Sequence, residues 1–578
     1  MAQAATIESP VYPELDRAVA DLAANKDGWA RTDVKTRIAL LEAIKAATMS
    51  VAESWATTAA RKKLIPPGSP LAGEEWLSGP YALLGACNAL IETLSQMESK
   101  AFLRRLPLRD LPSGQIAAAV VPASLWDRLL LSGVTAEVWM QPGVTRANLA
   151  DHVAGAYDVP AAARVGKVAL VLGAGNIAAI APLDVFQKLF SENQVVILKL
   201  NPVNDYLIDP LRIALAPLLA RGALRIVRGG ADVGSYLTEH PGVDEIHITG
   251  AESSHDAIVW GPGEEGRGAK ARGTPHNPRR VTSELGAACP TLVVPGPWSD
   301  ADIAFQAEHI ATQKLHNDGF NCIACQMLVV SAGWERTAAL VQSVETALKA
   351  APRRAPYYPG AEARMADFAA HGRDAERLER DGGDPCVLVP SVGESDAWLE
   401  THEVFAPALG VRRLAETDPE AFLRAAIAYA NERLRGTLGA NVVIHPKTVA
   451  AIGRERFEAI LAELRYGCIA INAWTGLGFL MARAPWGAFP GHRLDDAQSG
   501  IGFVHNTYMF DKAERTVVRA PFRPFPRSVL NGEMTLLPRP PWFVTNRKQQ
   551  VVGRLLTAFE YQPSWLKIPR IFWNALLG

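Results

Sequence analysis

The chain has 578 residues, of which 48% are hydrophobic and 21% are charged, and its 59 Lys and Arg balance 60 Asp and Glu. A chain of this length and composition can bury a large core, which excludes disorder as its main state and predicts two or three lobes. The net charge of −1 provides no global field to hold nucleic acid, so no nucleic-acid partner is expected and any charge-dependent function must be local.

The N-terminus and the cysteines indicate a cytoplasmic location. The first residues, MAQAATIESPVYPELD, contain neither a basic n-region nor an apolar h-region, so no secretory signal is expected. The longest weakly charged run, 168–183, is shorter than a bilayer span of about 20 residues. Six scattered cysteines suit a reducing compartment better than a disulfide framework.

The N-terminal third is expected to form helices whose role is packing. Apolar residues at helical spacing predict helices over 33–64 and 81–97, with a loop over 65–76 between them. Residues 134–144 have the composition of a strand.

The middle of the chain alternates between strands and helices. Strands are predicted over 167–173, 194–201, 223–230 and 243–250, and helices over 183–193 and 208–222. This alternation predicts right-handed crossovers and a parallel sheet with helices on both faces. Ligands of such sheets bind at the carboxyl ends of the strands.

The stretch GAGNIA follows the first of these strands. Gly173, Gly175 and Ala178 match the G-x-G-x-x-G/A dinucleotide fingerprint, which is weak evidence by itself. The second strand then ends in Lys199 instead of the carboxylate that usually binds the ribose hydroxyls. A lysine there can bind ribose hydroxyls or a phosphate.

The stretch HNDGFNCIACQ places Cys322 and Cys325 three residues apart. A zinc site needs four ligands, and no second C-x-x-C or H-x3-5-H accompanies them, so no metal is expected. A thioredoxin-like redox pair would be expected near the start of a small α/β domain, whereas Cys322 and Cys325 lie past the middle of the chain, so a redox pair is not favoured. Two buried thiols on one helix face, or a nucleophile with a packed neighbour, remain open.

Several stretches occur in the order that aldehyde dehydrogenases show, and the chain resembles that family over roughly residues 15–515. For example, SELGA resembles the family's E-L-G-G, and NDGFNC resembles N-x-G-Q-x-C. The full series reads GNIAAIAP, LKLNP, HITGA, SELGA, NDGFNC, HEVFAP, APWGAF and QSGIG.

The resemblance implies roles for named residues. Aligned through Asn317 and Gly319, the nucleophile would be Cys322, which forms a thiohemiacetal and then a thioester. The Asn176 side-chain amide and the Cys322 backbone N–H would bind the oxyanion. Glu284 would be the general base that activates the hydrolytic water.

The resemblance also implies a cofactor, NAD or NADP. Lys199 and Glu403 would hold its two riboses, and Gly230, Gly250 and Phe405 would line its site.

The expected fold class is α/β. It comprises a Rossmann-type parallel-sheet cofactor domain, an α/β catalytic domain, a bridging β segment that makes dimers in the family, and a C-terminal extension. These parts correspond to residues 1–120 with 160–283, 284–490, 121–159 with 491–520, and 521–578. A homodimer or homotetramer is expected.

The implied reaction is NAD(P)-dependent oxidation of a small-molecule aldehyde, an apolar one being favoured, to a carboxylic acid. One alternative is a CoA-acylating dehydrogenase or acyl-group reductase; Glu284 argues against it, because acylating relatives commonly lack this base. The other is an inactive scaffold, which the departures at His255, Phe320 and Ala406 keep open.

Further departures concern the cofactor site and the tail. Asn201 and Pro202 stand where NAD-preferring members carry a carboxylate, which makes NADP admissible. His255 replaces a glycine, and would crowd the phosphate site or bind phosphate itself. Residues 259–280 are expected to form a flexible surface loop, with a basic flap over the cofactor phosphates as the alternative.

The tail has no counterpart in common family members. Residues 522–578 contain eight Lys or Arg against two Glu, with an apolar helical face near 551–559. The tail is expected to dock on its own domain or on a neighbouring subunit; the alternative is peripheral membrane contact through 521–578.

Overall fold

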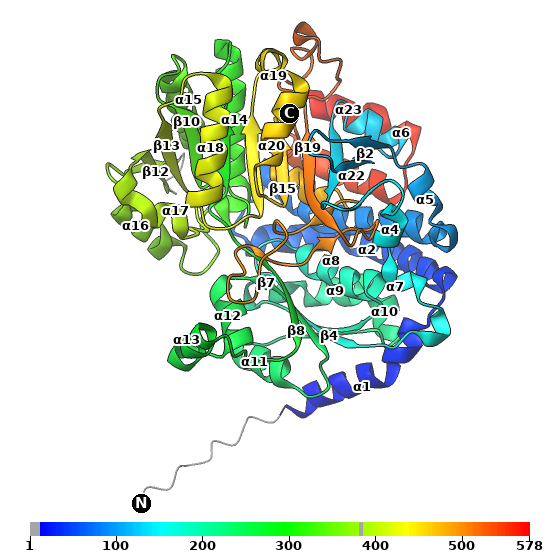
Figure 1. Ribbon diagram of the computed structural model, residues 1–578. Coiled ribbons are helices and arrows are strands. Elements are labelled where there is room, and N and C mark those ends of the chain that lie inside the picture. Colours follow the sequence, from blue (N-terminus) through cyan, green and yellow to red (C-terminus); the bar gives the residue numbers. More distant parts are fainter. Residues whose placement is uncertain (1–11, 381–384) are drawn as a thin grey trace, which may run out of the picture.

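The computed structural model of the chain describes residues 12–380 and 385–578 (Figure 1). Residues 1–11, which carry most of the stretch used to argue against a secretory signal, lie outside the described part. No helix of the described residues is both long and apolar enough to cross a bilayer.

The first sheet has the order β17-β8-β7-β4-β5-β6. Its strands are β4 (Val168–Leu172), β5 (Val195–Lys199), β6 (Leu224–Val227), β7 (Glu245–Gly250), β8 (Arg280–Leu285) and the antiparallel β17 (Gly500–Ile501). The four strands predicted in this region are confirmed as parallel neighbours. The near-continuous apolar runs of β4 and β5 are buried on both faces, as expected where helices cover a parallel sheet.

The helices of this layer depart slightly from prediction. The predicted helix over 183–193 is α8 (Ile180–Phe186), which continues as a π-helical turn, η6 (Gln187–Ser191). The helix over 208–222 breaks into α9 (Ile208–Ala214) and α10 (Ala216–Ala220). Pro217 explains the break, because its ring has no N–H to donate and clashes with the preceding turn.

A second sheet of eleven strands has the order β1-β2-β3-β19-β15-β14-β9-β10-β13-β12-β11. Its strands are β1 (Leu108–Asp110), β2 (Ile116–Val121), β3 (Thr135–Met140), β9 (Pro290–Val293), β10 (Met327–Ser331), β11 (Glu376–Glu379), β12 (Pro385–Val392), β13 (Ala408–Leu414), β14 (Gly439–Val443), β15 (Cys468–Ile471) and β19 (Ala513–Arg519). The strands from β15 to β12 run parallel.

The expected bridging segment joins this sheet. β3 pairs antiparallel with β19, and β19 pairs parallel with β15 of the same chain. The segment therefore extends the catalytic sheet of its own chain. The oligomeric state stays a prediction.

The N-terminal helices are α1 (Pro13–Ala30), α2 (Val34–Lys62) and α4 (Ala82–Ser95). The loop predicted over 65–76 is wrong in its second half, where η1 (Pro70–Ala72) leads into α3 (Gly73–Trp76) and the π-helical η2 (Leu77–Tyr81). Two carboxylates of α3, Glu74 and Glu75, are at most 1% exposed. Buried ion pairs with Arg354 and Lys63 hold this turn inside the protein.

The segment 259–280 is also more ordered than expected. After α12 (Glu252–Trp260) it forms α13 (Gly263–Arg272), which Lys270 links to Asp256 at 2.7 Å. The expectation of a flexible loop is therefore wrong, because a charged and Gly-rich stretch still gains a helix where ion pairs tie it down.

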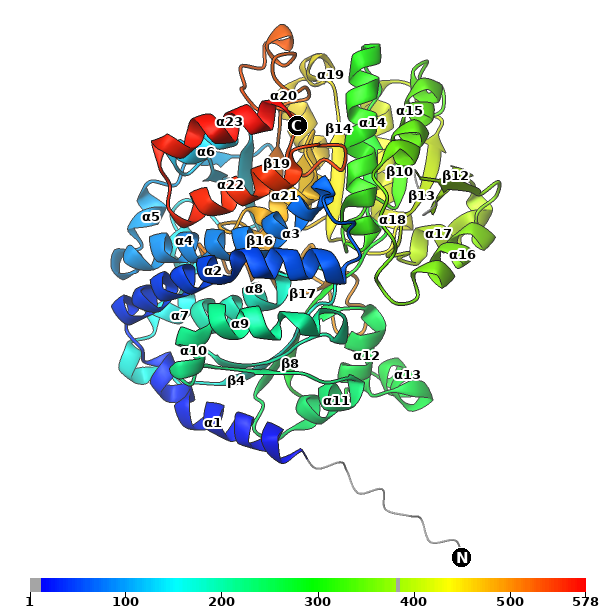
Figure 2. The ribbon, with the colours of Figure 1, turned by 180° about the vertical axis from the view of Figure 1, so that it is seen from behind.

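The C-terminal extension packs on its own chain through α22 (Gln549–Tyr561) and α23 (Ile568–Leu576) (Figure 2). α22 crosses α3 so closely that a Cβ on Gly73 would lie 2.3 Å from the Gln549 backbone carbonyl carbon. Asn88 of α4 donates 2.8 Å hydrogen bonds to Glu560. In the structure, the tail therefore docks on its own chain, which is one of the two docking sites expected for it.

Candidate active site

Cys322 lies in a loop between the single turn η8 (His316–Gly319), which follows α14 (Asp300–Leu315), and β10. Asn317, Asp318 and Gly319 have positive φ angles of 53°, 55° and 77°. A side chain on Gly319 would meet the Ala406 carbonyl carbon at 2.7 Å. This strained turn aims the loop at the cleft between the two sheets, as positions under backbone strain often do at functional sites.

The two neighbouring cysteines do not share a helix face, which corrects that expectation. Cys325 is fully buried and its backbone N–H donates to the Gln313 carbonyl at 3.0 Å. Cys322 is partly exposed, and both thiols are free. The positive-φ turn prevents a helix here, so the two side chains point to different environments.

The Cys322 thiol donates to the Glu284 carboxylate, with 3.2 Å between Sγ and Oε1. Glu284 comes from β8 and is 2% exposed. Its other oxygen, Oε2, is buried and has no hydrogen-bond partner among the described residues.

The electrostatics of this pair suit a proton acceptor. Burial, followed by the charge of Asp184, raises the pKa of Glu284 to about 7, against the lowering influence of the nearby Trp486 side chain and of the Cys322 thiol. Burial and the Glu284 charge raise the pKa of Cys322 well above its usual value. The resting thiol is therefore protonated, and its ionisation depends on transfer of the proton to a base.

Asn176 faces the same loop. Its side-chain amide donates to the Phe320 carbonyl at 3.0 Å, which fixes the amide and leaves its second N–H available. The Cys322 backbone N–H makes no hydrogen bond within the described residues. Asn176 and Cys322 line the same cavity.

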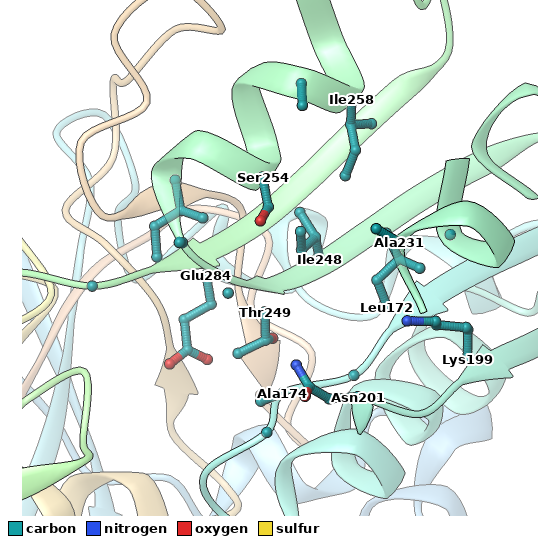
Figure 3. A pocket seen from close by; sticks show the side chains of 18 of the residues that line it. Leu172, Ala174, Lys199, Asn201, Ala231, Ile248, Thr249, Ser254, Ile258 and Glu284 are labelled. Carbon is teal, nitrogen blue, oxygen red and sulfur yellow. The ribbon is translucent and has the colours of Figure 1, made fainter. Parts of the chain in front are cut away.

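One cleft of about 790 Å³ is lined by Cys322 and by residues at the carboxyl ends of the strands of the first sheet, and Figure 3 shows part of it. In Figure 3 the side chains of Lys199 and Glu284 reach into the cavity from β5 and β8. All eight residues expected at the site line it, namely Asn176, Lys199, Gly230, Gly250, Glu284, Cys322, Glu403 and Phe405.

The residues of this cleft fit a dinucleotide. Burial lowers the pKa of Lys199, which the Asp232 carboxylate opposes, and its side chain ends β5 at the edge where such ligands bind. Gly230 caps α11 (Ala231–Glu239) beside the cleft. A helix N-terminus favours a phosphate group there.

Glu403 lies against the backbone of the SELGA stretch. A Cβ on Gly286 would be 1.9 Å from Glu403 Oε2, so a side chain at this position would displace the Glu403 carboxylate. Burial raises the pKa of Glu403 to about 8, although Arg364 and the Ala287 N–H oppose the shift.

The departures from the family pattern are accommodated by packing. His255 is 0% exposed and does not line the cleft, so the expectation that it crowds the site or binds phosphate is wrong. Its helix turns Ser254 into the cavity instead (Figure 3). Phe320 is fully buried and stacks on Tyr358 at 5.5 Å between ring centroids.

Sequence reasoning missed the groups that support the catalytic loop. Glu74 accepts the Asn317 backbone N–H at 3.1 Å, and Arg354 bridges Glu74 to the Asn317 side-chain oxygen. Tyr357 donates to the Asn176 carbonyl at 3.1 Å. These contacts join residues up to 280 positions apart, and the only local signal was the acidic pair inside an apolar stretch.

The model of the Aldehyde dehydrogenase family matches residues 212–500. A 1-pyrroline-5-carboxylate dehydrogenase from Bacillus pumilus is 26% identical over 302 residues, which are 50% of this chain and 54% of that protein. N-succinylglutamate 5-semialdehyde dehydrogenase 1 from Caulobacter vibrioides is 28% identical over 227 residues, 36% of this chain and 43% of that protein. The chain thus spans about half the length of these curated relatives.

Among solved structures, an indole-3-acetaldehyde dehydrogenase in complex with NAD⁺ aligns with a TM-score of 0.59 and 18% identity, covering 88% of each chain. A gamma-glutamyl-gamma-aminobutyraldehyde dehydrogenase from Burkholderia cenocepacia aligns with a TM-score of 0.58, 18% identity and the same coverage. These likenesses agree with the α/β fold of the two sheets. The family match over half of the chain shows that it belongs to the aldehyde dehydrogenase family.

Proposed function

We propose that the protein oxidises an apolar aldehyde to a carboxylic acid with NAD or NADP, through a covalent adduct on Cys322. The observation that carries the proposal is the 3.2 Å contact between the Cys322 thiol and Glu284 at the inner end of a dinucleotide-sized cleft. Relatives named as semialdehyde and pyrroline-carboxylate dehydrogenases support the same class of reaction.

The first step joins the Cys322 sulfur to the aldehyde carbon. The thiol proton leaves toward Glu284, and the carbonyl oxygen becomes an oxyanion as the C–S bond forms. The Asn176 amide and the Cys322 N–H are the donors placed to hold that oxyanion. Donors fixed before reaction stabilise developing charge most effectively.

A nicotinamide cofactor bound in the cleft would supply the acceptor for the hydride that the adduct carbon loses, and that loss would convert the adduct on Cys322 into a thioester. Glu284 releases the thiol proton to solvent, and its carboxylate then takes a proton from a water whose oxygen attacks the thioester carbon. The C–S bond breaks, the acid leaves, and the Cys322 thiolate takes back a proton from Glu284. A carboxyl with a pKa of about 7 is suited to taking and returning protons at neutral pH.

Lys199 and Glu403 are the proposed contacts to the cofactor riboses. Asn201 and Pro202 also line the cleft near Lys199. They bring no negative charge to that end, so a 2′-phosphate would not be repelled by them.

The test follows formation of reduced nicotinamide by its ultraviolet absorbance. NAD and NADP are supplied separately with short, long and aromatic aldehydes, and the parent is compared with Cys322→Ala and Glu284→Gln. Turnover is expected in the parent alone, and mass spectrometry of the product with CoA present should show free acid. Turnover surviving in Cys322→Ala would overturn the mechanism, and acyl-CoA as the product would move the assignment to the acylating class. An absence of turnover in the parent protein would favour the alternative of an inactive scaffold.

A further inference from the structure

A second cavity also reaches Cys322. This acyl pocket has a volume of about 50 Å³ and shares Asn176, Ile180 and Cys322 with the cleft. Its remaining walls are mainly apolar and aromatic, with Leu77, Trp474, Phe479, Trp486 and Trp542 among them, and Ser78, His316 and Asn321 are the polar residues that also line it. An aldehyde whose carbonyl carbon meets the sulfur would place its side chain here.

Trp542 is the one wall residue among these that comes from the C-terminal extension. Its side chain is 8% exposed, and Pro540 and Pro541 precede it, which restricts the backbone there. The next residue, Phe543, stacks on Phe305 and His309 at 5.4 and 5.3 Å between centroids.

Hydrogen bonds to α14 hold the same loop. The Val544 N–H donates to Thr312 at 3.2 Å, and the Thr545 hydroxyl donates to Glu308 at 3.0 Å. Because α14 leads directly into the turn that carries Cys322, the extension and the nucleophile are held by one helix.

Beyond Trp542 lies a further space, the outer cavity, of about 20 Å³. It is bordered by Leu537, Pro538 and Phe543 of the extension, and it shares Trp474, Leu477 and Trp542 with the acyl pocket. Trp542 therefore stands with Trp474 and Leu477 between two adjoining cavities, and of these three it alone belongs to the extension.

We propose that Trp542 is a specificity-determining residue that closes the acyl pocket and restricts the enzyme to short or compact apolar aldehydes. One water needs about 10–15 Å³ of free volume, so the acyl pocket of about 50 Å³ accommodates a side chain of about four non-hydrogen atoms. This inference rests on the proposed aldehyde oxidation and names its substrate class.

The experiment measures kcat/KM for straight-chain aldehydes of two to ten carbons in the parent, Trp542→Ala, Trp542→Phe and Phe543→Ala. The readout is the ratio of the octanal value to the butanal value. Trp542→Ala removes the ring that stands between the two cavities and is expected to raise this ratio at least about tenfold, since each methylene buried in a complementary pocket contributes about 0.8 kcal/mol. Trp542→Phe keeps a bulky ring and is expected to stay near the parent.

Phe543→Ala is the matched control, because Phe543 belongs to the same loop and borders only the outer cavity of the two. It is expected to keep the parent ratio. An unchanged ratio in Trp542→Ala, or an equal rise in Phe543→Ala, would overturn the assignment.

A thiol probe separates this inference from the proposed function. Alkyl methanethiosulfonates of one to eight carbons form a mixed disulfide with Cys322 and release methanesulfinate, and intact-mass spectrometry follows the rate, with Cys322→Ala as the blank. The rate in the parent should fall steeply beyond about four carbons and recover in Trp542→Ala. If no aldehyde is oxidised but this pattern appears, the pocket assignment stands without the reaction; chain-length-independent labelling in the parent would overturn it.

Discussion

At the scale of single residues, Asp184 tunes the pH dependence through Glu284. The Glu284 carboxylate, which is the form that accepts a proton, prevails above its pKa of about 7, so kcat should rise with pH through that value. Asp184 raises this pKa by its charge. Asp184→Asn removes the charge, and the rising limb should move to lower pH.

A pH–rate series in Asp184→Asn, with Asp244→Asn as control, checks this. Asp244 pairs with Lys26 at the surface and its variant should keep the parent profile. Glu284→Gln should lose roughly 10²–10⁴-fold in kcat above pH 7, where the parent carries the Glu284 carboxylate, as for removal of a positioned general base. If the rising limb of the pH–rate profile does not move in Asp184→Asn, the electrostatic coupling between Asp184 and Glu284 is refuted.

Lys199 should govern cofactor affinity more than chemistry. Its ammonium lies in the cleft at the end of β5, where Lys199→Ala would delete charge-assisted hydrogen bonds of about 1.5–3 kcal/mol. The KM for the cofactor should then rise roughly 10- to 100-fold. Measuring NAD and NADP separately also ranks them, because a 2′-phosphate at this ammonium makes the loss larger with NADP.

Lys167→Ala is the control for that change. Lys167 lies immediately before the first residue of β4, at the end of the sheet away from the cleft, and it pairs with Glu245. A cofactor KM that is unchanged in Lys199→Ala, or raised equally in Lys167→Ala, would remove Lys199 from the site.

At the scale of elements, the catalytic turn depends on a buried ion cluster supplied by α2, α3 and the loop that carries Arg354. Arg354 is 1% exposed and contacts Glu74 and Asn317 together. Arg354→Lys keeps the charge but cannot reach both partners with one ammonium. Because small misplacements of a nucleophile are costly, kcat should fall roughly 10- to 100-fold, while the cofactor KM changes little.

Arg37→Lys serves as the matched control, since Arg37 is equally buried but donates to backbone carbonyls such as those of Trp29 and Leu189. Calorimetry should show a lower Tm in both variants, and only Arg354→Lys should lose kcat. An equal loss of kcat in both would mean that the cluster acts through stability alone.

Local pattern predicted the elements that carry the cleft, because the buried strands β4, β5 and β7 have near-continuous apolar runs and each is followed by turn residues. The motif order then brought Lys199, Glu284, Cys322 and Glu403 into one cavity, as the structure has them. The buried role of α3 and the place of Trp542 between the two cavities escaped prediction. Both depend on contacts between segments more than 200 residues apart, and no spacing within either segment records its partner.

At the scale of the whole molecule, the bridging segment and the C-terminal extension find their strand pairing and packing partners within the same chain. β19 joins β3 to β15, so pairing of these strands needs no second copy. The extension covers α3 and reaches the acyl pocket, with Phe522, Phe543 and Val552 at most 1% exposed. Removal of the whole extension would therefore expose apolar core, and surface substitutions are the better probe of its outer face.

The outer face of the last helix remains without a partner. Leu566 of the 3₁₀ turn η11 (Trp565–Lys567), Trp573 of α23 and Leu577 at the end of α23 are 91%, 66% and 49% exposed, with Arg570 of α23 between them in sequence. The extension from 522 onward carries eight Lys or Arg against two Glu, whereas the rest of the chain carries 51 against 58. Tryptophan beside leucine and basic residues suits the headgroup region of an anionic bilayer.

We therefore expect the full chain to sediment with vesicles containing phosphatidylglycerol, less so in high salt, and not with phosphatidylcholine alone. The triple variant Leu566→Ser, Trp573→Ser, Leu577→Ser should lower the bound fraction at least about tenfold, since each buried large apolar side chain contributes about 1.5–3 kcal/mol. Its Tm should match the parent, because these side chains face solvent. Val165→Ser, at a site 78% exposed in the segment that leads into β4, should bind as the parent does. Equal binding of parent and triple variant would exclude this face as a lipid contact, and a change in sedimentation of the vesicle-free protein would assign it to self-association instead.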